Sequence, residues 1–471
     1  MEVTTAASGR GSRQPNLPVD HDEADRALRS WRFWLVVGLA GVGAGVGAGA
    51  LMAILHAVQH LAYGYRRGNF QRGVDRAAAW RRLVVLAGAG VVLGAAWVLL
   101  RKLGGPVRGL DEAVWEHKGQ MRPLDTAANA LLQIVAVGAG ATLGREGAPK
   151  ELGAGVASGL CDWAGLTPTQ RQILVACGAG AGMAAVYNVP LGGALFAAEV
   201  LLGTMALPVV VPALATAAVA TGTSWLLLPD RPTYDVGQLE TTGSLVGWAL
   251  LFGLLAGVLG AALVVLVGWA KERATKGTRA FGTITATFAA IGAVAIALPE
   301  VLGNGKDVTQ LALSGALGLP LVAAVVLVRP LATAACLRSG AVGGLFTPTM
   351  TIGALAGTLA GRAWDVLIPG NPVAAFTLIG AAALLSGAMQ SPIASIVLVV
   401  ELTHSGLSLL VPIVLAAAAA TAASRVLVPA SLYTAADWWG SGHDRSSRRR
   451  ARGGIAEQAR RLRRPPDDAG L

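Results

Sequence analysis

The chain has few charged residues for its length. Asp, Glu, Lys and Arg make up 14% of its 471 residues, whereas a soluble protein usually carries about 25%. So few charges cannot cover the surface of the three-domain cytosolic protein that the length alone would allow. With 54% hydrophobic residues, 62 glycines and a mean hydropathy of +0.57, the composition is typical of a protein embedded in lipid. The 12 tryptophans suit the water boundaries of such a protein.

Cysteine and histidine are also scarce. The three cysteines, Cys161, Cys177 and Cys336, lie far apart in apolar stretches, so we expect no disulfide framework. The six histidines form no motif with metal-ligand spacing, and His404 after Glu401 is the nearest approach to one. The sequence also has no HExxH motif or paired catalytic groups. We therefore expect no metal, no cofactor and no enzymatic activity, with a membrane hydrolase as the main alternative from another class.

The net charge of +11 comes largely from the C-terminal end. Nine arginines face four acidic residues from Ser441 to Leu471, which predicts a basic cytoplasmic tail that touches anionic lipid. A nucleic-acid-binding arm is the remote alternative. Residues 1–30 lack the apolar core of a secretory signal and read as a cytoplasmic segment. Six arginines between positions 66 and 82 would, taken alone, place the loop after the first apolar stretch on the cytoplasmic side. For the orientation of the chain in the membrane we give more weight to the basic tail.

Apolar stretches follow one another from Trp31 onward. Several are shorter than the roughly 20 residues that span a bilayer, or are cut by glycine and proline. Backbone that is not helical persists at membrane depth only where it lines a cavity or binds a ligand, so each interruption is a candidate site. The stretches are 31–63, 83–100, 123–143, 152–163, 172–205, 207–228, 243–270, 280–302, 308–336, 343–361, 372–402 and 407–428.

An internal repeat divides this apolar region. The stretch GAGAGMAAVYNVPLGGALFAAEV from Gly178 aligns with GAAALLSGAMQSPIASIVLVVEL from Gly380. GREGAPKELG from Gly144 aligns with GLFTPTMTIG from Gly344 at nearly the same offset. Two such matches are typical of a transporter whose substrate site lies between two related repeats. The expected divisions are 1–30, a first repeat at 31–230, a second repeat at 231–436 and a tail at 437–471.

The first repeat contains charged residues in a glycine-rich break. Arg145 and Glu146 stand between Gly144 and Gly147, and charges at membrane depth are costly enough to indicate a function. A helix that begins near Ala148 would direct its positive dipole end toward this point. We expect an anion to bind there and the carboxylate to compete with it. The alternative is an ion pair between Arg145 and Glu146 in a turn at the membrane surface.

The second repeat has a similar break, RSGAVGGLFTPTM, with Pro348 near the start of the next helix. The amides of Leu345 and Phe346 would point from the helix N-terminus into the same cavity. Their apolar side chains exclude water and add no competing charge.

Four motifs in this order resemble the CLC chloride channel and transporter family. GREGAP at 144–149 is similar to the family's GREGP, and GLFTP at 344–348 is similar to its GxFxP. NVPLGGALFAAE at 188–199 and SLYTA at 431–435 resemble two further family segments. The resemblance extends from about residue 31 to Tyr433.

The resemblance implies an all-α integral membrane protein of the cell membrane, with a CLC-type inverted repeat of tilted and broken transmembrane helices. It also implies a homodimer in which each subunit has its own path for chloride or a similar monovalent anion. Glu146 would be the gating residue, and the Tyr433 hydroxyl would bind the anion from the cytoplasmic side. The full set of expected anion-binding residues is Gly105, Arg145, Gly147, Gly344, Leu345, Phe346 and Tyr433.

Three departures from the family pattern matter. Gly105, in GGPVR at 104–108, falls where the family has an anion-coordinating serine, which leaves the preference among chloride, nitrate and other anions open. Tyr433 argues against the family's fluoride-selective branch. Lys150 and Glu151 stand where the family is mostly uncharged. They either pair with each other, or Lys150 faces the pathway and draws anions toward it.

The third departure concerns coupling to protons. Val200 follows Glu199 at the position where the family's exchangers carry the internal proton-transfer glutamate. We therefore expect passive or weakly proton-coupled anion movement, with proton/chloride exchange as the alternative and an organic-anion transporter as a second one. Glu199 is either a neighbouring proton relay or a structural carboxylate like its repeat mate Glu401. The family's larger members carry regulatory domains after the tyrosine, and with 38 residues following Tyr433 we expect none here.

Overall fold

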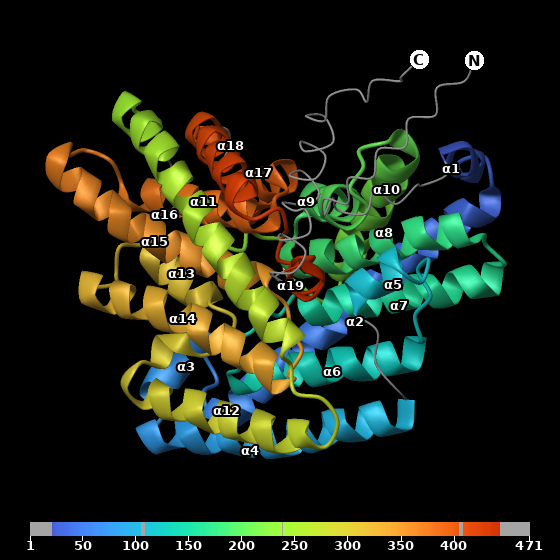
Figure 1. Cartoon of the computed structure of the whole chain (residues 1–471), viewed down its shortest axis with the longest axis horizontal. Helices are drawn as coiled ribbons and strands as arrows, with labels where there is room; N and C mark the ends of the chain where they lie inside the picture. Colours follow the sequence, from blue (N-terminus) through green and yellow to red (C-terminus); the bar gives the residue numbers. More distant parts are fainter. Residues whose placement is uncertain (1–20, 105–108, 238, 405–407, 443–471) are drawn as a thin grey trace, which may run out of the picture.

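The computed structural model describes residues 21–104, 109–237, 239–404 and 408–442. The regular elements of these residues are all helices (Figure 1). Those of the first half are α1 (His21–Ala27), α2 (Trp31–Tyr63), α3 (Phe70–Arg76), α4 (Ala79–Gly104), α5 (Leu110–Trp115), α6 (Pro123–Ala139), α7 (Gly147–Ala164), α8 (Pro168–Tyr187), α9 (Pro190–Leu195), a π-helical turn (Phe196–Leu201) and α10 (Leu207–Ser224).

The second half is similarly built from long helices and short ones. It contains α11 (Gly243–Glu272), α12 (Arg279–Ala297), a 3-10 turn (Pro299–Val301), α13 (Lys306–Leu313), α14 (Leu319–Ser339), α15 (Phe346–Leu367), α16 (Val373–Met389), α17 (Pro392–Thr403), α18 (Leu410–Leu427) and α19 (Ala435–Gly442). In Figure 1, α4 and α12 lie side by side along one edge of the molecule.

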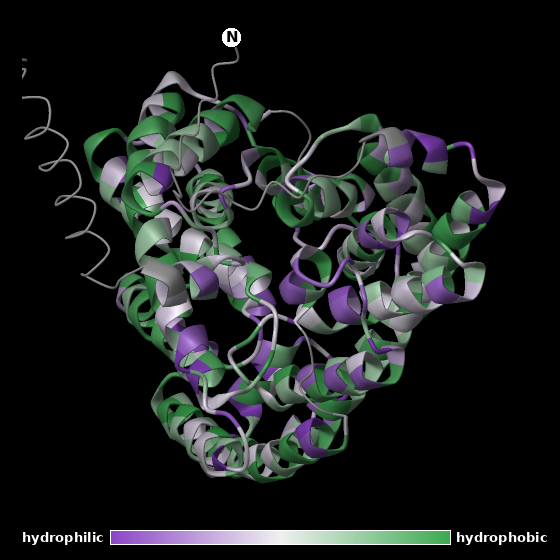
Figure 2. Cartoon of the chain, turned by 45° about the vertical axis from the view of Figure 1, so that its right-hand side comes forward, coloured by the Kyte–Doolittle hydropathy of each residue, from purple (hydrophilic) through white to green (hydrophobic). Residues whose placement is uncertain are grey.

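Within the described residues, seven helices are long and apolar enough to cross a membrane: α2, α4, α10, α11, α12, α14 and α18. Many leucine and valine side chains of these helices are exposed on the surface of the protein. In Figure 2 the outer helices are coloured mostly as hydrophobic. In α4 the most apolar window is 28% buried, so most of it faces the surroundings. The chain is thus a multi-pass membrane protein, and the predicted membrane fold is confirmed.

The predicted interruptions separate the shorter helices. Stretch 172–205 divides into α8, α9 and the π-helical turn, and stretch 372–402 divides into α16 and α17. The breaks have the same form in both repeats. Asn188 and Gln390 end α8 and α16 in the left-handed conformation, with φ of 58° and 55°, and Pro190 and Pro392 begin the next helices.

Glycine pairs let equivalent helices approach closely in each repeat. Where α7 crosses α8, a Cβ on Gly153 would overlap the carbonyl oxygen of Gly178. Where α15 crosses α16, a Cβ on Gly353 would lie 2.6 Å from the carbonyl oxygen of Gly380. These contacts fix the positions of α7 and α15, whose N-terminal ends build the candidate site.

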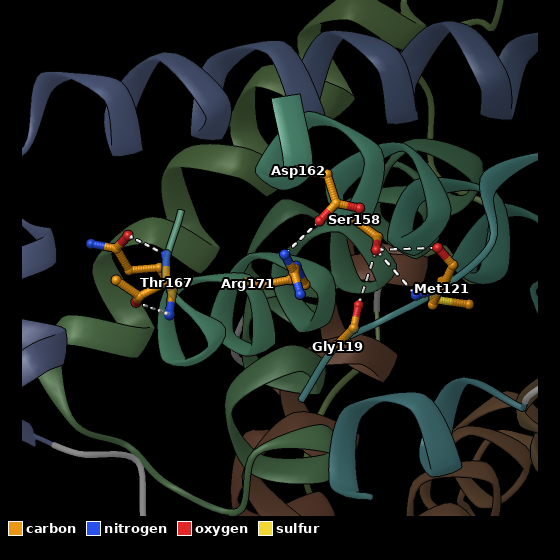
Figure 3. A network of polar contacts seen from close by, with 7 residues as sticks. Gly119, Met121, Ser158, Asp162, Thr167 and Arg171 are labelled. Carbon is orange, nitrogen blue, oxygen red and sulfur yellow. Dashed lines mark hydrogen bonds and ion pairs between the residues drawn. The ribbon is translucent and has the colours of Figure 1, made fainter. Parts of the chain in front are cut away.

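The far end of α7 is held by a polar network (Figure 3). The Ser158 hydroxyl donates to the Gly119 carbonyl at 3.0 Å and accepts from the Met121 amide at 3.1 Å. Arg171 of α8 pairs with Asp162 of α7. These interactions join α7 to the loop before α6 and to the start of α8.

A buried arginine orders the loop before α13. The Arg329 side chain is fully buried and donates to the carbonyls of Glu300 at 3.0 Å and Gly303 at 2.6 Å. A buried charge is tolerated where hydrogen bonds replace its hydration, and here they tie α14 to the 3-10 turn.

Candidate functional site

The two glycine-rich breaks meet at the centre of the molecule. Gly144 and Gly344 form an isolated antiparallel bridge in which the Gly144 amide donates to the Gly344 carbonyl at 2.7 Å, and the Gly344 amide donates back at 2.9 Å. A Cβ on either glycine would overlap the Glu146 carboxylate, so a side chain at either position would displace that carboxylate. Because α7 and α15 begin two or three residues later, their positive N-terminal ends converge at this bridge.

The Glu146 carboxylate occupies the space between these helix ends. The residue is fully buried, and its Oε1 accepts from the Phe346 amide at 2.7 Å. Its Oε2 accepts from the Thr347 hydroxyl at 2.8 Å and from the Tyr187 hydroxyl at 3.1 Å. The Phe346 amide and the two hydroxyls, which also form a hydrogen bond with each other, thus surround one negative group at the start of α15, which is the arrangement that binds anions at helix N-termini.

Arg145 lies beside this site without pairing with Glu146. Its guanidinium lies over the Tyr187 ring, 4.8 Å from the centroid, and contacts the Met52 sulfur at 3.9 Å. The ion pairs among the described residues involve other side chains, so the expected alternative of a surface ion pair is wrong. Both residues are too deeply buried for a surface turn.

Arg145 lines a cavity of about 120 Å³, which we call the Arg145 cavity. His56, Lys306 and Arg231 also line it. Its lining residues include no Asp or Glu, so basic groups dominate this approach to Glu146.

A second and larger cavity lies beside the bridge, at the first turn of α7 and the residues that precede α15. It measures about 720 Å³ and is lined by Gly147, Gly344, Leu345, Lys150 and Tyr433, among others; we call it the Lys150 cavity. Lys150 and Glu151 are both buried and, within the described part of the chain, do not pair with each other. That expected pairing is wrong because Glu151 binds elsewhere: its carboxylate accepts from the Asn129 amide at 2.6 Å.

Glu199 and Glu401 hold helices of the opposite repeat. The Glu199 carboxylate accepts from the amides of Ile393 at 3.3 Å and Ala394 at 2.6 Å, in the first turn of α17. The Glu401 carboxylate accepts from Leu191 and Gly192, at 3.0 and 2.6 Å, in the first turn of α9. Both carboxylates are therefore engaged as reciprocal helix caps.

Val200 is buried in the π-helical turn beside Glu199 and brings no ionisable group to either cavity. Gly105 lies outside the described residues, as do residues 1–20 and the tail from 443 onward. The predicted anion-site residues Gly147, Gly344, Leu345, Phe346 and Tyr433 surround Glu146 or line the Lys150 cavity.

Tyr187 and Thr347 were not among the residues predicted from the sequence. The sequence did contain a signal for Tyr187. This residue brings a hydroxyl to the end of an apolar stretch, where the aligned residue of the other repeat is the apolar Met389. Thr347 directly follows Phe346 in the GLFTP motif, but its hydroxyl could be assigned to Glu146 only after the two repeats were placed together.

One group in the described residues has the donor spacing of a metal site. Glu112, Glu116 and His117 bring ligand atoms within 4.8 Å of one another. The two glutamates are exposed, and exposed acidic groups commonly gather without a metal.

Comparisons with known proteins agree with this geometry. The profile of the family described as "Voltage gated chloride channel" matches residues 95–425. The chain is 33% identical over 428 residues to the voltage-gated ClC-type chloride channel ClcB of Shigella flexneri, covering 84% of this chain and 96% of the relative. It is 32% identical, with the same coverage, to the ClcB of Escherichia coli strain UMN026.

Two solved structures share the fold. A slow cyanobacterial Cl⁻/H⁺ antiporter matches with a TM-score of 0.75 and 19% identity, and a CLC-type fluoride/proton antiporter matches with 0.71 and 22%. Each match covers 86% of this chain and 97% of the other. The paired glycine-rich helix starts, the buried glutamate and these similarities lead to one conclusion: the chain belongs to the CLC family of voltage-gated chloride channels and transporters.

Proposed function

We propose that this protein moves chloride or a similar monovalent anion across the membrane, with Glu146 as the gate. The anion would pass from the Arg145 cavity through the site now held by the Glu146 carboxylate to the Lys150 cavity. The observation that carries the proposal is that the Phe346 amide and the hydroxyls of Thr347 and Tyr187 surround that carboxylate. An anion in the same position would receive the same hydrogen bonds.

The charges that line the Arg145 cavity support this path for the anion. The Arg145 cavity is lined by cationic groups, which raise the local concentration of anions. When the Glu146 carboxylate leaves the site, the Phe346 amide, the two hydroxyls and the positive end of α15 lose their ligand. An incoming anion restores these interactions, so carboxylate and anion compete.

We further propose that this movement is passive or only weakly coupled to protons. Val200 cannot carry a proton, and Glu199 is occupied by two amides of α17. The alternative is proton/anion exchange, and it is favoured by the two antiporters that share the fold. In either case Glu146 would be the group that takes up a proton on leaving its site.

The proposal is tested by chloride efflux from liposomes that hold the purified protein. Internal pH is recorded while a chloride gradient is imposed, with a potassium ionophore to carry the balancing charge and no proton ionophore, and Glu146→Ala serves as the matched variant. We expect electrogenic chloride efflux from the wild type with little proton movement. In the variant, efflux should continue without dependence on pH.

Each other outcome has a definite meaning. Proton movement against its gradient would refute the uncoupled mode and favour exchange. Chloride efflux that is inhibited by small carboxylates would favour the organic-anion transporter. An absence of any anion flux from correctly folded protein would refute the proposed function.

A further inference from the structure

Lys150 is a buried lysine whose side chain forms no direct ion pair within the described residues, although Asp111 and Glu151 line the same cavity. Its side chain lies in the first turn of α7 and the residue is 5% exposed. The ion pairs of the described residues do not include it, and the neighbouring Glu151 binds Asn129 instead. A charge taken out of water is retained only where other groups, or a ligand, replace its hydration.

The contacts of the Lys150 ammonium leave part of its capacity unused. Its Nζ lies 3.4 Å from the Tyr433 hydroxyl, and 4.8 and 5.1 Å from the ring centroids of Phe196 and Tyr433. An ammonium has three N–H donors, and Tyr433 is the one hydrogen-bond acceptor that the described residues give it. Lys150 and Tyr433 both line the Lys150 cavity, together with Gly344 and Leu345 at the start of α15.

This contact also orients the phenol. Because the Tyr433 oxygen accepts from Lys150, the hydroxyl hydrogen is directed away from the ammonium. One O–H and at least one N–H are thus adjacent and free to bind a single ligand. The ligand that these donors fit is a small anion, since both are hydrogen-bond donors and one carries a positive charge.

We propose that Lys150, beside the Tyr433 hydroxyl that the family resemblance already assigns to the anion, is a second ligand of the anion at this inner site and sets the preference for chloride. The site rests on the proposed function, because an anion must pass through the cavity to reach it. A compact ammonium favours small, strongly hydrated anions such as chloride over larger ones such as nitrate and thiocyanate. It would also supply a donor in a pathway where Gly105 brings no hydroxyl.

Other charged groups on the same cavity are engaged differently. Arg101 donates to the Gly340 carbonyl at 2.6 Å, and Lys271 donates to the Leu432 carbonyl at 3.3 Å. Asp111, Glu112 and Glu151 also line the cavity. Lys271 therefore provides a matched control: a lysine on the same cavity whose ammonium is already bound to the backbone.

The test compares Lys150→Met, Lys150→Arg and Lys271→Met with the wild type. Chloride affinity is measured by titration calorimetry on the purified protein, and the flux ratio of chloride to nitrate and thiocyanate is measured in liposomes. Loss of one charge-assisted hydrogen bond predicts about tenfold to hundredfold weaker chloride binding in Lys150→Met. The flux ratio should move toward nitrate and thiocyanate. We expect Lys150→Arg to recover part of both properties, and Lys271→Met to lose much less of either than Lys150→Met, because the Lys271 ammonium is already bound to the Leu432 carbonyl.

A double variant and a direct observation complete the test. Tyr433→Phe should lower chloride affinity less in the Lys150→Met variant than it does in the wild type, because the two donors act on one anion. If Lys150→Met does not fold, crystals of the wild type soaked in bromide should show anomalous density within hydrogen-bond distance of both Nζ and the Tyr433 oxygen.

The inference is overturned if Lys150→Met folds and keeps wild-type affinity and selectivity, or if bromide binds elsewhere in the cavity. These results are independent of the proposed function. A wild type that binds bromide at Lys150 but passes no anion would refute transport and leave the inner site in place.

Discussion

Replacing Glu199 by glutamine tests whether this residue is a structural carboxylate or a proton carrier. Each Glu199 oxygen accepts one amide from the first turn of α17. Glutamine keeps one acceptor oxygen but turns an NH₂ donor toward the second amide. The lost bond is worth about 1.5–3 kcal/mol, and the remaining one weakens by about 1 kcal/mol when its acceptor loses its charge. Discounted for the partial exposure of Glu199, the expected loss is about 1.5–3 kcal/mol of unfolding free energy.

The expected change in melting temperature follows from chain length. Unfolding entropy is about 2.1 cal/mol/K per residue, so in a chain of this size each kcal/mol lowers the melting temperature by about 1 °C. Glu199→Gln should therefore melt about 1.5–3 °C below the wild type in detergent. Glu401→Gln should melt lower by a similar amount, because its carboxylate binds two amides of α9 at comparable distances.

Proton movement is measured on the same variants in liposomes. We expect the number of protons moved per chloride to be unchanged by Glu199→Gln, since the carboxylate is occupied as a helix cap. A changed proton count with no loss of melting temperature would refute this reasoning and make Glu199 the internal relay. An unchanged melting temperature in Glu401→Gln would equally contradict the capping role.

Three further changes test other parts of the structure. Thr347→Val removes one donor to the Glu146 carboxylate and to an anion that replaces it, and should weaken chloride binding to the Glu146→Ala variant about tenfold; an unchanged affinity would show that this hydroxyl does not face the anion. Gly178→Ala would place a methyl group against a carbonyl of α7 and should lower thermal stability by about 1–3 kcal/mol, whereas Gly222→Ala, which has open space around it, should not lower it. Arg329→Met leaves buried carbonyls without donors, at about 1–3 kcal/mol each, so we expect a lower melting temperature and less folded protein by size-exclusion chromatography.

Much of the architecture could be predicted because membrane insertion leaves a direct mark on sequence. The stretch 31–63 coincides with α2, and the breaks near Pro190 and Pro392 fall where proline forces a new helix to begin. Glycine-rich interruptions likewise marked the loops around Glu146 and Phe346, because charge and irregular backbone are costly in lipid.

The contacts within the site could not be predicted in the same way. The Tyr187 hydroxyl reaches Glu146 across 41 residues, and Lys150 reaches Tyr433 across 283. Such contacts depend on how each helix is rotated and how closely helices pack, and hydropathy does not encode either property. The reciprocal capping by Glu199 and Glu401 was hidden for the same reason, although the repeat had already aligned the two residues.

The bridge between Gly144 and Gly344 has a consequence for how such a path can open. It joins the two repeats by backbone hydrogen bonds at the point where the anion would pass. Separating the repeats there would leave buried amides and carbonyls unpaired, whereas rotation of the Glu146 side chain would leave every helix in place. Structures obtained with the pathway filled and empty should therefore superpose in their backbone and differ in a single rotamer.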